Sequence, residues 1–233
     1  MKLSVFFASV LTSSLFIVSS CTQDSVESQS TLPYQSNFQR STDGWVADIA
    51  DYSKQMDDIR FESNWTGLPK PLDSQSKSLM ISSMNRSDDV FMFLKKKLTG
   101  LHPNTDYQLV FDVELASAYA DNSIGIGGSP GGSVFLKAGA TAVEPKPQLK
   151  DDFYELNIDK GTQSEGGRDA VVLGNVGIGE DKTDYTLIKR SNADKPFTAH
   201  TNGQGELWLV VGTDSGYEGQ TTLYYSNIKV TVK

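Results

Sequence analysis

The sequence has only one cysteine and two histidines among its 233 residues. One cysteine excludes a framework of disulfide bonds, and it also excludes a zinc site built on thiolates. His102 lies in a Leu-His-Pro-Asn turn, and His200 lies at the end of a short predicted strand. Neither is close to a serine at the kind of strand-to-helix turn that presents a hydrolase nucleophile, so we do not expect a histidine-dependent hydrolase.

Basic residues are scarce as well, with 21 Lys and Arg against 29 Asp and Glu and a formal net charge of -8. A domain this acidic repels phosphate backbones and anionic lipid surfaces. The longest cationic run, Lys95-Lys96-Lys97, is typical of a solvated strand end. The glycine-rich segments 124–132 and 174–179 lack the spacing of a nucleotide-binding loop. We therefore predict no nucleic-acid or nucleotide ligand.

Long apolar runs are absent after residue 20, so nothing there is long enough to cross a bilayer. Before it, Lys2 is followed by an apolar stretch from Leu3 to Val18, which is typical of a signal peptide. The stretch leads into Val18-Ser19-Ser20-Cys21, which resembles the bacterial lipobox. This resemblance implies that residues 1–20 are removed and that Cys21 carries a diacylglycerol through a thioether.

Two other interpretations of this leader are an ordinary signal peptide with an incidental cysteine and a retained membrane anchor. The stretch is short and rich in serine for a spanning helix. By the same resemblance, Thr22 in place of Asp favours the outer membrane over the inner one. Residues 21–36 are rich in Ser, Gln and Thr, and we interpret them as the lipidated cysteine and a flexible tether. We expect a lipid-anchored envelope protein, on either the periplasmic or the surface side.

Residues 37–233 have the pattern of one all-β domain. From Tyr107 to Leu115 every odd position is apolar, which indicates a half-buried strand. The same alternation predicts an inward row of Tyr224, Ile228, Val230 and Val232 on the last strand. Residues 90–94 and 207–211 are apolar on both faces, so we expect central strands. Because no long segment has a period of 3.6 and turns rich in Gly and Pro separate the runs, we predict a β-sandwich or jelly roll.

Three segments together resemble one family. The resemblance covers the start, middle and end of the domain: Asn37-Phe38 with Asp43-Gly44-Trp45, residues 78–113 with Leu98-Thr99-Gly100-Leu101, and the closing strand 222–230. In this order they resemble the galactose-binding-like jelly roll of many carbohydrate-binding modules. The resemblance implies a jelly-roll sandwich, a glycan ligand and, in many members, a structural calcium ion.

At two positions this sequence lacks the carboxylates that the resemblance implies as calcium ligands. Gln39 stands where Glu is usual, and Ser226 stands where the first Asp of the closing strand is usual. Calcium prefers anionic oxygen ligands, so we expect no metal or other cofactor. Ser226 falls on the predicted inward row, and we expect its hydroxyl to be buried and bonded to the backbone.

Exposed aromatic rings are the candidate ligand contacts, because a ring face can stack on sugar C–H groups. Trp65, Tyr119 and Tyr217 lie in polar, turn-like surroundings and could contact a ligand or cover the end of the core. Trp45 and Trp208 are expected in the core. The long glycine-rich region 117–182 is interpreted as turns and bulges, with a loop wall beside a ligand groove as the alternative.

Two functions remain open at this stage. The first is a non-catalytic module that binds a glycan or an envelope protein. The alternative is a glycan hydrolase or lyase that uses carboxylates on the sandwich, since 29 acidic residues include many conceivable pairs. Two carboxyl groups that face each other about 5–9 Å apart in a cleft would favour the enzyme. A shallow groove with exposed rings would favour the binding module.

Overall fold

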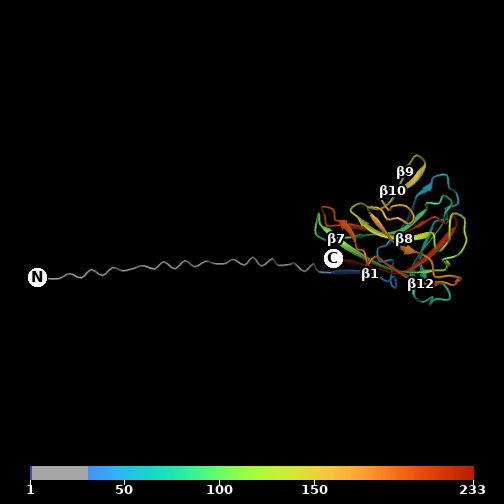
Figure 1. Cartoon of the computed structure of the whole chain (residues 1–233), viewed down its shortest axis with the longest axis horizontal. Coiled ribbons are helices and arrows are strands. Elements are labelled where there is room, and N and C mark those ends of the chain that lie inside the picture. The colour runs from blue at the N-terminus through green and yellow to red at the C-terminus, as the bar shows by residue number, and fades with distance from the viewer. Residues whose placement is uncertain (2–30) are drawn as a thin grey trace.

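The computed structural model describes Met1 and residues 31–233, which form an all-β jelly-roll sandwich (Figure 1). No helix in this part of the chain is both long and apolar enough to span a bilayer. The predicted signal peptide and Cys21 lie outside the described residues, as does most of the predicted tether, and their roles remain predictions. The tether was predicted to extend to residue 36, but Leu32–Ser36 form a strand of the sandwich, β1, so the domain begins earlier than residue 37.

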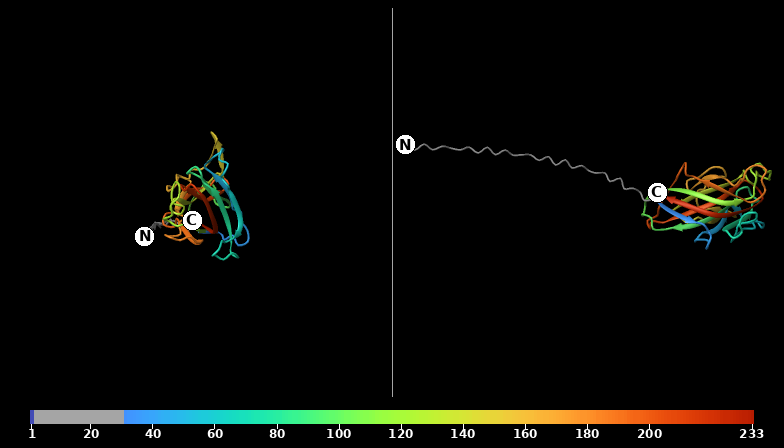
Figure 2. Two further views of the ribbon diagram at one scale, coloured as in Figure 1. Left: turned by 90° about the vertical axis from the view of Figure 1, so that its right-hand side faces the viewer. Right: turned by 90° about the horizontal axis from the view of Figure 1, so that it is seen from below.

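The larger sheet, sheet A, has seven antiparallel strands. β1 pairs with β15, so the first described strand lies beside the end of the last, with Leu32 opposite Val232. Both ends of the described domain therefore lie at one pole of the sandwich (Figure 2). The strands in order across the sheet are β12 (Thr186–Ser191), β7 (Asp106–Ser117), β15 (Gln220–Val232), β5 (Lys77–Met84) and β4 (Glu62–Gly67), with β13 (Phe197–His200) beside β7 and β1 (Leu32–Ser36) beside β15.

Sheet B packs against sheet A and has five strands. A small third sheet projects from the body of the sandwich (Figure 2). Sheet B consists, in order, of β11 (Ala170–Asn175), β8 (Val134–Thr141), β14 (Leu207–Ser215), β6 (Phe91–Leu98) and β2 (Val46–Ala50), and the small sheet of β3 (Tyr52–Ser53), β10 (Phe153–Leu156) and β9 (Pro147–Lys150).

The alternation predicted for β7 is confirmed. Leu109, Phe111, Val113 and Leu115 are buried between the sheets, whereas Asp112 and Glu114 lie on the opposite, outer face. β7 thus contributes one row to the core and one row to the outer face of sheet A. The outer face of sheet A is the surface on which the candidate site is built.

The predicted inward row of the last strand is correct only for Ile228, Val230 and Val232. The pairing of β15 with β7 shifts register between Tyr225 and Asn227, which is a β-bulge. One extra residue reverses the alternation on the far side of the bulge. Tyr225 is therefore fully buried, and Tyr224 faces outward and is only half-buried.

Sheet B is covered on both faces, as the apolar runs in β6 and β14 predicted. Its outer face is covered by the small sheet and by residues 157–169, which form a second apolar cluster with it. This cluster consists of Ala50, Phe91, Phe93, Ile158 and Val210, with Leu156 packed against it. The cover does not reach Trp208, which is half-buried and lies beside Lys97, so its placement in the core was wrong.

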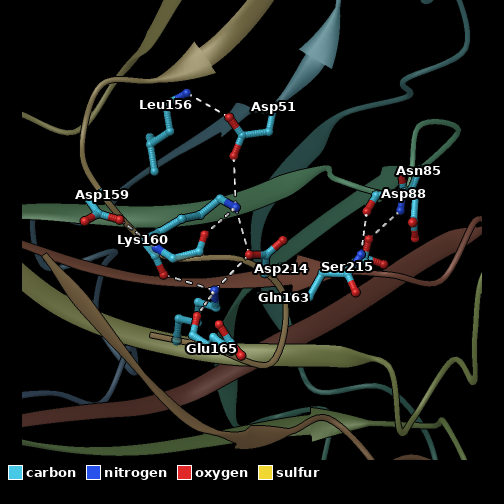
Figure 3. Close-up of polar contacts among 12 residues, drawn as sticks. Asp51, Asn85, Asp88, Leu156, Asp159, Lys160, Gln163, Glu165, Asp214 and Ser215 are labelled. Atoms are coloured by element: carbon cyan, nitrogen blue, oxygen red, sulfur yellow. Dashed lines mark hydrogen bonds and ion pairs between the residues drawn. The ribbon is translucent and has the colours of Figure 1, made fainter. Parts of the chain in front are cut away.

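A buried charge cluster lies beneath this cover. Lys137 of β8 and Asp214 of β14 are both fully buried, with Nζ and Oδ2 2.9 Å apart. Lys160 reaches down from the cover to Asp214 (2.7 Å) and to Asp51 (3.2 Å), as Figure 3 shows. Lys95 is buried too, between Asp48 and Glu144, so the prediction of a solvated strand end is wrong for Lys95 and holds only for Lys97, which is exposed.

Candidate ligand-binding site

An open groove of about 720 Å³ crosses the outer face of sheet A. Its floor is made of two rows of polar side chains that are neighbours across β1, β15, β7 and β12. The first row runs Gln35–Lys229–Asp112–Ser191, and the second runs Asn227–Glu114–Lys189. Asp112 and Glu114 share this face because they stand two residues apart on one strand.

The floor is ordered by hydrogen bonds and ion pairs between its own side chains. Glu114 accepts a hydrogen bond from Ser226 (2.8 Å) and lies 3.3 Å from Lys189 Nζ. Asp112 accepts one from Ser191 (2.7 Å) and lies 3.9 Å from Lys229 Nζ. A ligand therefore meets polar groups whose positions are already restricted, which lowers the entropy cost of binding.

Residues 37–39 form one wall of the groove and are anchored by Phe38. The Phe38 ring is buried in the core, although its backbone adopts a φ of 56°, which costs about 1–3 kcal/mol for a bulky residue. Burying the ring offsets this strain, and the neighbours Asn37 and Gln39 are left lining the groove. The Gln39 side chain accepts a hydrogen bond from the backbone of Lys77 (3.3 Å).

An apolar row lies next to the polar floor on the same face. It runs from Met80 across Tyr224 and Ala116 to Leu187, which is 39 % exposed. The Tyr185 ring meets the Tyr224 ring edge to face, with centroids 5.3 Å apart. Burial raises the pKa of Tyr185 to about 12, so its phenol keeps its proton and can donate a hydrogen bond. The face thus combines half-buried rings with ordered polar groups.

The three aromatic residues predicted from the sequence do not line this groove. Trp65 is 45 % exposed on edge strand β4, and its indole N–H donates to the carbonyl of Phe38 in the wall (2.7 Å). Tyr119 follows the end of β7, and its phenol oxygen accepts a hydrogen bond from the backbone N–H of Thr222 in β15 (2.7 Å). Tyr217 packs against the core at the pole opposite the chain ends. Their role in ligand contact stays a prediction.

The calcium site implied by the sequence resemblance does not fit the donors present. Gln39 and Ser226 both line the groove, but each is hydrogen-bonded within the protein. Ser226 also donates to the backbone carbonyl of Glu114 (3.1 Å), in accord with its predicted backbone contact, although it stands at the bulge rather than in the inward row. Among the described residues, no three His, Cys, Asp or Glu side chains form a cluster suited to a metal ion.

The groove holds two carboxylates, Asp112 and Glu114, which are its candidate pair for glycoside hydrolysis. They stand two residues apart on β7, so their Cα positions are separated by about 6.4–6.8 Å along the strand. A glycosidase places its two carboxyl groups on either side of the scissile bond, and one of them must carry a proton. Here both stand side by side on one strand, and each has a lysine partner. This arrangement suits hydrogen bonding to a ligand better than acid–base catalysis.

Residues 127–131 have the Gly-x-Ser-x-Gly spacing of a hydrolase nucleophile turn, which was not among the predicted sites. In the structure Ser129 donates a hydrogen bond to the carbonyl of Asp121 (2.8 Å), in the loop that follows β7. His200 instead pairs with Asp106 (2.7 Å) at the start of β7, the opposite pole, and His102 lies in the neighbouring turn. The described residues therefore assemble no serine–histidine pair.

No family model matches the chain, and no curated protein matches it at a significant level. Several solved structures are similar to it. A carbohydrate-binding module that recognises mannan, TmCBM27, has 10 % identity and a TM-score of 0.45 over 88 % of this chain and 99 % of that one. A putative sugar-binding protein from Bacteroides thetaiotaomicron has 11 % identity and a TM-score of 0.41, over 84 % and 92 % of the two chains.

A third similar structure, TmCBM61 in complex with β-1,4-galactotriose, has 8 % identity and a TM-score of 0.33 over 79 % of this chain and 86 % of that one. With TM-scores below 0.5, these likenesses carry no conclusion about the ligand of this chain.

Proposed function

We propose that this protein is a non-catalytic carbohydrate-binding module whose ligand lies in the groove on sheet A. The observation that carries the proposal is the juxtaposition of the ordered polar floor with the row that contains Tyr224 and Leu187. A sugar has hydroxyl edges that need hydrogen-bond partners and C–H faces that pack on rings. The two rows offer these two surfaces side by side.

The charges of the floor favour an uncharged glycan. Its two lysines, Lys189 and Lys229, each lie beside a carboxylate of β7, and Arg190 at the groove's edge donates to backbone carbonyls. An acidic sugar would have to compete with these partners. The net charge of -8 adds a general repulsion of polyanions. Neutral oligosaccharides avoid both costs.

We also propose that the module is carried on the cell envelope by lipid on Cys21. The support is the sequence Val18-Ser19-Ser20-Cys21 behind an apolar leader. Acyl chains give stable anchoring when two or more are present. An outer-membrane location follows from Thr22 by the same resemblance.

A glycan array tests the proposed ligand class. The probe is the mature chain from residue 21 with Cys21→Ser, so that no lipid is attached, applied to neutral and acidic oligosaccharides. We expect binding to at least one neutral series and none to uronic-acid or sulfated series. A blank array would contradict glycan binding, and binding confined to acidic glycans would contradict the assignment of the groove's charges.

A further inference from the structure

A second depression of about 440 Å³ lies at the seam between the two sheets. One side is the edge strand of sheet B, β11, and the other is the turn that leads from β12 to β13. Ser191 lines both this seam cleft and the groove on sheet A. The two depressions therefore meet at one residue on the rim of β12.

The two walls of the seam cleft differ in chemistry. Val171 and Val172 of β11 are half-buried and give this wall its apolar part, although Val171 also packs against the core. The polar backbone of Gly166 and Gly167 completes the wall. Asp194 and Lys195 stand on the opposite wall, and both are exposed. Neither has an ion-pair partner among the described residues. The cleft thus presents an apolar surface facing free polar groups.

The polar wall is rigid because Asn192 holds the turn from inside. The buried Asn192 side chain accepts from Phe111 N (2.7 Å) and donates to the carbonyls of Leu109 (3.2 Å) and Lys195 (3.3 Å). The backbone N–H of Lys195 donates back to Asn192 (3.0 Å). These bonds fix the turn to β7 without using the side chains of Asp194 and Lys195.

Arg190 closes the seam at one end. Its guanidinium reaches from β12 across to sheet B and donates to the carbonyls of Asn175 (2.8 Å) and Gly177 (2.9 Å). The sheets are therefore bridged beyond the cleft, and the opening is local. A local opening of this kind suits a single sugar ring, whose C–H face can pack on the apolar wall while its hydroxyl groups meet the polar wall.

We propose that the seam cleft is a further sugar subsite, occupied by a unit of the same neutral oligosaccharide that lies in the groove. This inference rests on the proposed function. The ligand would pass from the groove to the cleft beside Ser191, because this residue lines both depressions. Its hydroxyl is held in place by Asp112 (2.7 Å) and by the N–H of Ala193 (3.1 Å). Because the two depressions meet at Ser191, a chain that fills the groove and extends past this residue places a further unit in the cleft.

The test compares ligands of two lengths on matched variants. The probes are β-linked gluco-, xylo-, manno- and galacto-oligosaccharides, each as the disaccharide and the hexasaccharide, titrated by calorimetry. The test variant is Asp194→Ala/Lys195→Ala, which removes one charge of each sign. The control is Lys150→Ala/Glu155→Ala, an exposed ion pair of the small sheet. Thermal melts establish that each variant is folded, and Lys195→Ala alone replaces the double variant if that does not fold.

We expect the hexasaccharide of a bound series to bind at least about fivefold more tightly than the disaccharide. The test variant should lose most of that difference and keep the affinity for the disaccharide within about twofold. The control should behave as the native chain. Equal affinity for both lengths, or an unaltered hexasaccharide affinity in the test variant, would overturn the subsite and leave the groove intact. Failure of all four series, together with a blank glycan array, would overturn the proposed function and the subsite with it.

Discussion

Lys137 Nζ lies 2.9 Å from Asp214 Oδ2, and neither side chain has any exposure to solvent. The other two donors of Lys137 are taken by the carbonyls of Lys160 and Glu165, both in the segment that covers sheet B. Burial lowers the pKa of Lys137, and the nearby Asp214 opposes that effect. The ion pair and these hydrogen bonds therefore connect residues 157–169 to sheet B at a site from which water is excluded.

Breaking this pair from one side should strongly destabilise the fold. We predict that Asp214→Asn lowers the free energy of unfolding by about 3–5 kcal/mol, because the fully buried Lys137 then loses its carboxylate partner, whereas Lys160 keeps Asp51. Denaturant unfolding measures it. The exposed pair Lys54–Asp152 is the control, where Lys54→Ala should cost no more than about 1 kcal/mol. A similar small loss for Asp214→Asn would show that the buried pair does not hold the cover.

The cover should also respond to acid through Asp159. Its carboxylate accepts the backbone N–H groups of Arg168 and Gly161, both at 3.1 Å, and these bonds lower the pKa of Asp159 below its usual 3.8. Because the folded pKa is below the unfolded one, the carboxylate stabilises the fold above about pH 4 and loses that effect as pH falls through the folded pKa.

We therefore predict that Asp159→Asn costs less than about 1 kcal/mol at pH 7 and flattens the loss of stability below pH 4. The site is mostly exposed, which limits the size of the effect. Hydrogen exchange of residues 159–168 at pH 5 and pH 3 reports it locally. An unchanged pH profile in the variant would show that these hydrogen bonds do not couple the loop to pH.

Tyr224 and Tyr225 form a matched pair for separating binding from folding. Tyr224 lies on the outer face of sheet A, in the row beside the polar floor, whereas Tyr225 is fully buried one residue later. We predict that Tyr224→Ala weakens glycan binding at least about tenfold with little loss of stability, and that Tyr225→Ala costs about 3–5 kcal/mol of stability. Calorimetric titration and denaturant unfolding measure the two effects. An unchanged glycan affinity in Tyr224→Ala would show that the Tyr224 ring does not contact the ligand.

Much of the fold follows from period-2 patterns, and the failures have local causes. The rows in β7 were predictable because nothing interrupts the alternation from Tyr107 to Leu115. The prediction for Tyr224 in the last strand was wrong because a bulge leaves no clear signal in the sequence. The prediction for Trp208 was wrong because its exposure depends on how far a distant segment, residues 157–169, extends over sheet B.

The candidate site was less predictable than the fold. The alternation in β7 implies that Asp112 and Glu114 face outward. The groove itself could not be predicted, because β12, β15 and residues 37–39 also line it and their positions depend on the tertiary fold. The seam cleft joins residues 166–173 to the turn at 191–195, and no sequence periodicity links those two segments. The glycine-rich region contributes backbone to the cleft at Gly166 and Gly167, and its role as a loop wall beside a ligand stays a prediction.

The anchor can be tested separately from the domain. We predict that Cys21→Ser releases the protein from the membrane fraction and abolishes labelling by a palmitate analogue, because the thioether cannot form. Fractionation with the native chain as reference measures both. Unchanged partitioning of the variant into membranes would contradict lipid anchoring at Cys21.

The most direct test of the groove is to follow backbone amide signals by NMR while the neutral oligosaccharide selected on the array is added. The account predicts shifts concentrated in β7, β12 and the second half of β15 and at residues 37–39, with the cover at 157–165 unaffected. Shifts confined to the cover, or to the loops that carry Tyr119 and Tyr217, would contradict the groove on sheet A as the binding site.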